Sequence, residues 1–580
     1  MHRIRLKIVW LLLLGCLVSA APNAPAESLT DAYLNAYFEQ FPTRATAAGV
    51  YRYDDRLEDL GAPGREAWIV EQRDYRKRVV AALATRPETA DRIDLELLLR
   101  EIDNALFDWT VLDRPRRDPL FWVEPLSHAS LYLALREDRP APERMRLALR
   151  RSEAIPKLVK QALEALSDAS PEQVIPQAAT EAQSRLTALA GFYRSGLPQA
   201  EGIDARLQRK LRRSGERAAR AIEGLAKRSA ELAATGRADF RLGARYAERF
   251  KLGTGIDTPI ADVLTGAHRE LIEKRGEAAA YGRGVWSQFY PKEPLPADDR
   301  LILRRLFRAI ESQRPASNAE LVAQYTADAE TAFRFAASRE LVSIPEPRSL
   351  TIGTVPAWLG GQSVGGVFAP GPFAADAQTL FLLPNIAQSV PHADKVRFFS
   401  AFNSAFNRMI VPHELVPGHY LQLKTAAHQS RAVRSVFGDG VYIEGWGSFS
   451  ERLMLDHGWG GVPERLAHYK KQLENIARLI ADISVHTARW QQPQLTQFAT
   501  EEALMDEQFA ANLWQRTLFS SPQLTTYHLG YRDFYALWMR WLARNQSHAR
   551  TREFVDAALS LGAIPIREYA DDPFFALGKL

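Results

Sequence analysis

The sequence predicts a mainly α-helical protein with a small β element near residues 348–384. Two observations support this fold class. Apolar residues recur at helical spacing through most of residues 28–345, and the same pattern returns after about residue 393. Between these regions, two short runs of β-branched or large apolar residues flank a glycine-rich stretch. The chain has 580 residues, more than one simple core usually holds, so we expect more than one subdomain.

The first twenty residues differ from the rest. A basic head precedes an apolar run at 8–18, which small residues follow at 19–21, and this order is typical of a secretory signal peptide. The run is too short to span a bilayer. Cys16 is the only cysteine and follows Leu-Leu-Gly, so lipoprotein cleavage before it is the alternative. We expect residues 1–20 to be a signal peptide of a periplasmic or secreted protein, with no membrane span and with a lipid anchor at Cys16 as the second route.

Charge and cysteine content exclude several classes of protein. Removing Arg3, Arg5 and Lys7 with the signal peptide lowers the formal net charge from +5 to about +2, and no basic motif indicates binding to nucleic acid. The mature chain has no cysteine to form a disulfide or a zinc–thiolate site.

Residues 28–345 are predicted to form an N-terminal helical region. The segment 91–109 carries one apolar stripe at mostly four-residue spacing, made by Ile93, Leu97, Leu98, Ile102 and Leu106. Ser170 before Pro171 is typical of a helix start. The basic segment 206–232 is predicted to be a long helix whose charges form a solvated face.

The β element is predicted from "SLTIGTVP" (349–356) and "TLFLLP" (379–384), with "GGQSVGGVFAPGPF" (360–373) between them. We expect two short strands joined by a flexible glycine-rich loop. Two interpretations stay open. The strands form a surface hairpin, or one of them is an edge strand that borders a cleft and pairs with an extended peptide.

Residues 346–580 are predicted to form a catalytic region around "HELVPGH" (413–419). Its two histidines are six residues apart, so in a regular helix His419 would point about 120° away from His413. Pro417 and Gly418 lie between them and favour a bulge or a break in the helix. A deformed helix could therefore bring both rings to one metal ion.

Two carboxylates on the following helix are candidates for a third ligand. Glu444 and Glu451 are seven residues apart and share a helix face, but about 10 Å of rise separates them. One of them is expected to bind metal, and the other to pair with an arginine or to orient a histidine. Three protein ligands with an open fourth position are typical of catalytic rather than structural zinc.

The runs "HELVPGHYLQ" and "EGWGSFSERL" closely resemble the paired motifs HExxPGHxxQ and EGWxxYxE of the bacterial family catalogued as domain of unknown function 885. Three further segments, at 42–61, 478–490 and 521–534, are similar to other blocks of that family, so the resemblance covers nearly the whole mature chain. Phe449 stands where the family usually has Tyr, and Gly447 where Ala is common. Neither position is expected to touch the metal.

The resemblance implies a secreted zinc peptidase with a helical fold. The family is distantly similar to angiotensin-converting enzyme and the oligopeptidases, in which two helical halves enclose a deep cleft. Carried over by motif, His413 and His419 match the histidine ligands, and Glu444 matches the third ligand, with Glu451 as the alternative. Glu414 matches the general base, which takes a proton from the attacking water and passes it to the leaving amine.

The implied reaction also needs a hydrogen-bond donor for the negative charge that develops on the scissile carbonyl oxygen. Tyr527 and His528 are the first candidates and His486 the next, although each could instead be a packing residue. Arg478, Asp482 and His486 recur every four residues, as in a ladder that supports the site or a stabilised helix face.

Three functions remain open on the sequence. The first is a zinc metallopeptidase with a peptide substrate. The second is a zinc hydrolase of non-peptide amides or esters, and the third is a catalytically inactive peptide-binding protein of the same fold. Glu414 argues against the third, because a binding protein needs no carboxylate beside the metal. A serine hydrolase is disfavoured because the chain has no G-x-S-x-G elbow. Endo- or exopeptidase action and the oligomeric state are not decided.

Overall fold

The computed structural model describes residues 28–356, 366–545, 550–571 and 575. It confirms the predicted fold class, because the chain is mainly helical and carries one small sheet. The predicted signal peptide and Cys16 lie outside the described residues, as does part of the glycine-rich loop. Among the helices that are described, none combines the length and apolar character needed to cross a membrane.

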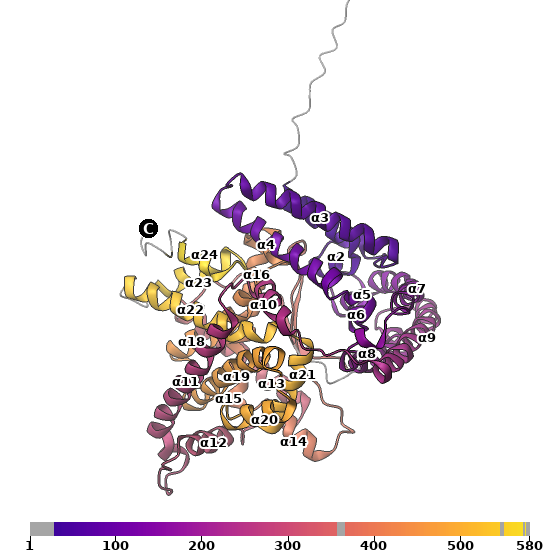
Figure 1. Ribbon diagram of the computed structural model, residues 1–580. Coiled ribbons are helices and arrows are strands. Elements are labelled where there is room, and N and C mark those ends of the chain that lie inside the picture. The colour runs from indigo at the N-terminus through magenta and orange to yellow at the C-terminus, as the bar shows by residue number, and fades with distance from the viewer. Residues whose placement is uncertain (1–27, 357–365, 546–549, 572–574, 576–580) are drawn as a thin grey trace, which may run out of the picture.

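The N-terminal helices form two hydrophobic clusters, one around α6–α9 and one around α1–α4. Figure 1 shows α2–α9, in indigo to purple, gathered together at the top and right of the view. Their bounds are α1 (Leu29–Gln40), α2 (Pro42–Ala48), α3 (Ala62–Ala84), α4 (Thr89–Leu106), α5 (Arg114–Arg117), α6 (Leu120–Leu135), α7 (Ala141–Ala165), α8 (Pro176–Gly191) and α9 (Ala205–Thr235).

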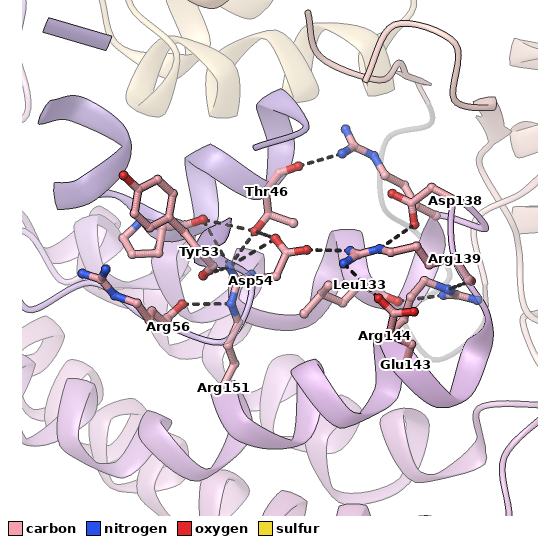
Figure 2. A network of polar contacts seen from close by, with 12 residues as sticks. Thr46, Tyr53, Asp54, Arg56, Leu133, Asp138, Arg139, Glu143, Arg144 and Arg151 are labelled. Carbon is pink, nitrogen blue, oxygen red and sulfur yellow. Dashed lines mark hydrogen bonds and ion pairs between the residues drawn. The ribbon is translucent and has the colours of Figure 1, made fainter. Parts of the chain in front are cut away.

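A buried polar network holds α2 against α6 and α7 (Figure 2). Asp54 accepts hydrogen bonds from the hydroxyl of Thr46 at 2.6 Å and from the guanidinium of Arg139 at 2.5 Å. Arg151 is fully buried and donates to the hydroxyl of Thr46 and to the carbonyl of Arg56. Three of these residues lie in the 42–61 segment, so that segment has a structural role in joining the N-terminal helices.

Helices α10–α13 share a hydrophobic cluster with the C-terminal helices, to which α4 adds Ile93 and Leu97. They are α10 (Tyr246–Thr254), α11 (Ile260–Phe289), α12 (Asp299–Ile310) and α13 (Asn318–Ser338). Figure 1 shows α11 and α12 beside α18–α20. The division of the chain at residue 345 stays a prediction, but the hydrophobic core is continuous across it.

The C-terminal helices pack mainly around α19, α18 and α22. They are α14 (His392–Ala401), α15 (Ser404–Glu414), α16 (His419–Gln429), α17 (Ala432–Val436), α18 (Gly440–Asp456), α19 (Val462–Thr487), α20 (Gln492–Glu501), α21 (Glu507–Phe519), α22 (Gln523–Asn545), α23 (Thr551–Ser560) and α24 (Ile566–Asp571).

The β element has three strands instead of the two predicted: β1 (Leu350–Thr354), β2 (Gly366–Phe368) and β3 (Thr379–Leu383). The hairpin interpretation is wrong, because β1 runs parallel to β3 and β2 pairs with the other side of β3 in the antiparallel sense. All of β3 is buried. Its residues alternate: Leu380 and Leu382 pack toward α6, whereas Phe381 and Leu383 join the large helical core.

Candidate metal centre

The "HELVPGH" segment ends one helix and begins the next. Helix α15 ends at Glu414 and α16 begins at His419, so the predicted break lies at Pro417 and Gly418. A Cβ atom at Gly418 would lie 1.9 Å from the carbonyl oxygen of His413, which leaves no room for a side chain there. The break brings the rings of His413 and His419 together, with centroids 4.7 Å apart.

Glu444, on α18, joins the two histidines. Its Oε2 atom lies 3.7 Å from Nε2 of His419 and 3.9 Å from Nε2 of His413. The three side chains each offer one ligand atom, and all three atoms lie within 4.8 Å of one another. The structure therefore brings together the three residues that the sequence predicted as ligands.

Hydrogen bonds on the far side of each ring orient the histidines. Nδ1 of His413 lies 2.9 Å from the carboxylate of Glu451, and Nδ1 of His419 lies 3.0 Å from the amide oxygen of Gln422. An oxygen acceptor at Nδ1 holds a proton there, so Nε2 is the nitrogen of each ring that is turned toward Glu444.

Glu451 was the alternative third ligand, and the structure gives it a different position. One carboxylate oxygen bonds Nδ1 of His413, and the other lies 3.1 Å from Nδ1 of His468 on α19. Glu451 is completely buried. Its carboxylate is thus engaged behind His413, away from the three-atom cluster, in the orienting role expected for the carboxylate that does not bind metal.

The charges of the three clustered residues depend on one another. Burial, followed by the neighbouring ring of His419, lowers the pKa of His413 to about 3. Burial disfavours charge on His419 and Glu444 as well, but their mutual attraction outweighs it, so the pKa of His419 is raised and that of Glu444 is lowered. His413 and Glu444 are thus held in the neutral and ionised forms that bind metal, whereas His419 is the cationic partner of Glu444 and would lose a proton when a metal binds.

Glu414 is the last residue of α15 and follows His413 directly. Its side chain is partly exposed. Within the described part of the chain, its carboxylate forms no hydrogen bond or ion pair. A carboxylate in this position, unpaired beside the three ligand atoms, is free to accept a proton from a water molecule bound among them.

A single side chain, Gln523, links Tyr527 to Glu444 of the predicted metal centre. Nε2 of Gln523 donates to the carboxylate of Glu444 at 3.1 Å and to the hydroxyl of Tyr527 at 3.0 Å. Burial and the charge of Glu444 raise the pKa of Tyr527, so its hydroxyl keeps its proton at neutral pH. Of the three predicted oxyanion donors, Tyr527 is the one that the structure connects to the cluster.

His528 and His486 have partners elsewhere. Nε2 of His528 bonds the carboxylate of Glu270 on α11. His486 accepts the backbone N–H of Leu242 at Nδ1, at 3.2 Å, and faces the carbonyl of Thr517 with Nε2, at 2.9 Å. Both ring nitrogens of His486 are therefore used, which leaves no N–H for a substrate oxyanion.

The Arg478–Asp482–His486 series does not form a ladder. Arg478 donates to the side chain of Asn475 at 2.6 Å, and Asp482 accepts from Tyr246 and Ser521 at 2.6 and 2.9 Å. No ion pair joins the members of the series among the described residues. Each member is instead tied to a different neighbour.

Gly447 lies closer to the site than expected. A Cβ atom at Gly447 would be 2.8 Å from Nε2 of His413, so this position packs directly against the ring of a predicted ligand. Phe449, the other departure from the family pattern, packs among aromatic rings that include Trp446 and Phe534. Only Phe449 is remote from the three ligand atoms in the way that we expected.

Several site residues were not assigned a role from the sequence. Gln422 lies within the quoted motif, three residues after His419, where one turn of helix brings it back to that ring. Gln523, Arg516 and His468 come from other helices. No spacing in the sequence relates these residues to the motif, so only the fold could find them.

The comparisons with known proteins agree with the predicted family. The model of a family described as "Bacterial protein of unknown function (DUF885)" matches residues 42–570. None of the curated proteins matches. Two similar solved structures are a "putative lipoprotein of unknown function" from Shewanella oneidensis (20% identity, TM-score 0.74, 94% of this chain and 99% of that one) and a "putative lipoprotein" from Colwellia psychrerythraea (16% identity, TM-score 0.75, 93% and 97%). At these identities the likeness shows the fold.

Proposed function

The chain belongs to the bacterial DUF885 family, and on that premise we propose that it is a zinc-dependent metallopeptidase that acts outside the cytoplasm. One observation carries the proposal. His413, His419 and Glu444 converge with three ligand atoms, while separate partners hold the far nitrogen of each ring. The carboxylate of Glu414, which has no hydrogen-bond or ion-pair partner among the described residues, directly follows the first ligand in the chain. Ligands, orienting partners and base together are the parts of a hydrolytic metal site.

The three ligand atoms fit zinc. With bonds of about 2.0–2.1 Å in a tetrahedral arrangement, neighbouring ligand atoms lie about 3.3 Å apart. The distances from Glu444 to the two histidines are 3.7 and 3.9 Å, and all three ligand atoms lie within 4.8 Å of one another, so the side chains would close by about 0.5–1.5 Å around the ion. Two imidazole nitrogens and one carboxylate oxygen suit Zn²⁺ better than Mg²⁺ or Ca²⁺, which prefer oxygen ligands throughout.

A zinc ion held there supplies Lewis acidity, which lowers the pKa of a water molecule and polarises the scissile carbonyl. The protein's own groups do the rest. The carboxylate of Glu414 accepts the proton of the attacking water and delivers it to the leaving amine nitrogen. The hydroxyl of Tyr527 donates a hydrogen bond to the carbonyl oxygen as negative charge develops on it.

A cavity reaches the outer side of the metal centre at Gln422, although its lining does not include His413, His419 or Glu444. It has a volume of about 260 Å³, and its lining includes Gln422, Ile443, Val367 and Phe368. Val367 and Phe368 belong to β2, an edge strand of the sheet. An extended peptide can pair with an edge strand through its backbone, whereas a simple ester or amide cannot. This observation favours peptides over the rival non-peptide substrates.

We also propose that the cavities belong to one deep cleft between two helical parts. A second cavity, of about 250 Å³, shares Tyr37 and Arg44 with the first. Its other walls come mainly from α1–α6, whereas the first is closed by α16 and α18. The β element borders this space through Val367 and Phe368 of β2. An exported enzyme with such a cleft would admit short or unfolded chains.

Export is tested by the mass of the mature N-terminus. A start at Ala21 means a soluble exported protein, and a lipid-modified Cys16 means an anchored one. An intact Met1 on protein purified from the cytoplasm would contradict both.

The activity is tested with zinc-loaded protein and a mixed peptide library, with product masses read with and without a chelator. We expect hydrolysis of peptide bonds that stops on chelation and returns when zinc is added. A panel of non-peptide amides and esters serves as the comparison. Cleavage confined to that panel would favour the rival hydrolase, and peptide binding without any cleavage would favour the inactive binding protein.

A further inference from the structure

Three basic side chains lie next to the metal centre without an acidic partner. They are Lys471 and Arg478 of α19 and Arg516 of α21, hereafter the cationic cluster. Lys471 and Arg478 line one cavity of about 90 Å³. The guanidinium groups of Arg478 and Arg516 both lie against the ring of Tyr527, at 5.0 and 5.6 Å from its centroid. Two members of the cluster, Arg478 and Arg516, thus lie against the predicted oxyanion donor.

Arg516 is tied to the centre through one side chain. It donates from Nη2 to the amide oxygen of Gln523 at 2.9 Å, and the amide nitrogen of Gln523 donates to Glu444 at 3.1 Å. One amide and two hydrogen bonds therefore separate the guanidinium from a predicted metal ligand, a distance within roughly 8 Å. This is about the length of two residues of an extended peptide.

None of the three cations forms an ion pair within the described part of the chain. Arg478 bonds the side-chain amide of Asn475, and Arg516 bonds the amide of Gln523 and the hydroxyl of Tyr527, all of them neutral groups. Lys471 lies 6.0 Å from the centroid of the ring of Phe406. All three side chains are partly shielded from water. Basic groups withdrawn from water without an anion are costly, so their retention points to an anion that arrives with the ligand.

Mutual repulsion within the cluster supports this. Burial, and then the charge of Arg478, lowers the pKa of Lys471; burial, and then the charge of Arg516, lowers the pKa of Arg478. An anion bound among them would relieve that repulsion as well as the loss of hydration.

The surrounding carboxylates do not neutralise the cluster once a metal is bound. A Zn²⁺ ion balances Glu414 and Glu444. Glu474 lines the same cavity as Lys471 but forms no ion pair with the cluster among the described residues. Glu451 is already shared by two histidines. The three basic side chains of the cluster then face only two remaining carboxylates, those of Glu474 and Glu451. The net charge of the region therefore stays positive.

We propose that the cationic cluster binds the C-terminal carboxylate of the peptide substrate, so that the enzyme removes one or two residues from the C-terminus. This inference rests on the proposed peptidase function and adds the end of the chain that is cleaved. Arginine presents paired N–H donors that match a carboxylate. The terminal carboxylate is the one anion that every unmodified peptide carries, and the reach from the metal corresponds to one or two residues.

The test compares two zinc-dependent cleavage rates on peptides of one neutral sequence, both acetylated at the N-terminus. One peptide ends in a free carboxylate and the other in an amide. We expect kcat/KM to be about 10- to 100-fold higher for the free acid, the size of a lost charge-assisted hydrogen bond. Product masses should show release of one or two C-terminal residues.

Each other outcome has a distinct meaning. Equal cleavage of both peptides at internal bonds would overturn the inference and leave the metallopeptidase intact. A second peptide is amidated but carries Asp near its C-terminus. If it is cleaved as fast as the free acid, the inference is overturned too, because the cluster would then bind acidic side chains. Cleavage of neither peptide, nor of any library member, would overturn the proposed function and this inference together.

Variants assign the preference to the cluster. Arg516→Gln and Arg478→Gln should each lower the rate on the free acid about 10-fold or more beyond any loss on the amide, so that the ratio of the two rates falls toward one. Equal losses on both peptides would instead indicate oxyanion stabilisation and would contradict carboxylate binding. Arg209→Gln, at an exposed position on α9, is the matched control, and zinc content checks that each variant has folded its site.

Discussion

The carboxylate of Glu451 bonds Nδ1 of His413 at 2.9 Å, on the side of the ring opposite the atom that faces Glu444 and His419. Its other oxygen bonds His468, so Glu451 is fixed from two sides. This contact holds the ring of His413 in place and raises the basicity of its free nitrogen. We therefore expect Glu451 to position the ring of His413 rather than to bind metal.

Replacing Glu451 by Gln should weaken zinc binding by about 10- to 100-fold, the usual effect of losing the partner of a metal-bound histidine. Glu444→Gln should weaken it further, because that change alters a ligand. Zinc affinity measured by competition with a chelator checks the order, with Glu273→Gln on the surface of α11 as the control. The reverse order would transfer the ligand role to Glu451.

Tyr527→Phe removes the hydroxyl that we assign to the oxyanion and leaves the ring between its neighbours. Turnover should fall by about 10²-fold, as when one oxyanion donor is lost, while zinc content stays the same. Tyr535→Phe, two turns further along α22, is the matched control for losing a hydroxyl from the same helix. A wild-type rate in Tyr527→Phe would remove this residue from the reaction.

The close approach of α18 and α22 depends on Gly530. A Cβ atom there would lie 2.0 Å from the carbonyl oxygen of Val441 and 2.5 Å from the Cα of Gly445, the residue after Glu444. Gly530→Ala should lower the free energy of unfolding by about 1–3 kcal/mol, the cost of overpacking, and should weaken zinc binding by moving Glu444.

The control for this change is another helical glycine. A Cβ atom at Gly284, on α11, would meet no other atom within 4 Å. Gly284→Ala should therefore be neutral or stabilising by up to about 1 kcal/mol. Chemical denaturation of the two variants gives the comparison. Equal stability in both would show that the two helices do not need the glycine contact.

Glu101 lines the second cavity, and burial there raises the pKa of its carboxyl from 4.5 to about 7. Between these two values the folded state holds more protons than the unfolded state, so stability falls as the pH rises through this window. Glu101→Gln removes the titration. The variant should exceed the wild type in stability by about 1–2 kcal/mol at pH 8 and match it near pH 4.5. A pH-independent difference would contradict this account of Glu101.

Local spacing in the sequence predicted the helical class and the break at Pro417 and Gly418. The resemblance to the family's motifs selected Glu444, rather than Glu451, to join His413 and His419. The sequence missed the parallel pairing of β1 with β3, which depends on how the chain crosses between the strands. It also could not show that Leu242 and Thr517 occupy both nitrogens of His486, because the position of this residue along α19 carries no sign of them. The periodicity of a sequence gives no information about partners that come from distant segments.

The same reason explains the residues that were missed. Gln422 could have been assigned, because three residues along a helix return it to His419. Gln523 and Arg516 could not, since their relation to Glu444 exists only where α18, α21 and α22 meet.

The most direct test of the central claim is one purified variant, Glu414→Gln, measured for both zinc content and peptide cleavage. Glutamine keeps nearly the same shape but cannot accept the proton of the attacking water. We predict full zinc occupancy, because Glu414 is not a ligand, and a fall in turnover of about 10²–10⁴-fold. A Glu414→Gln variant that holds zinc and hydrolyses peptides at the wild-type rate would contradict the account.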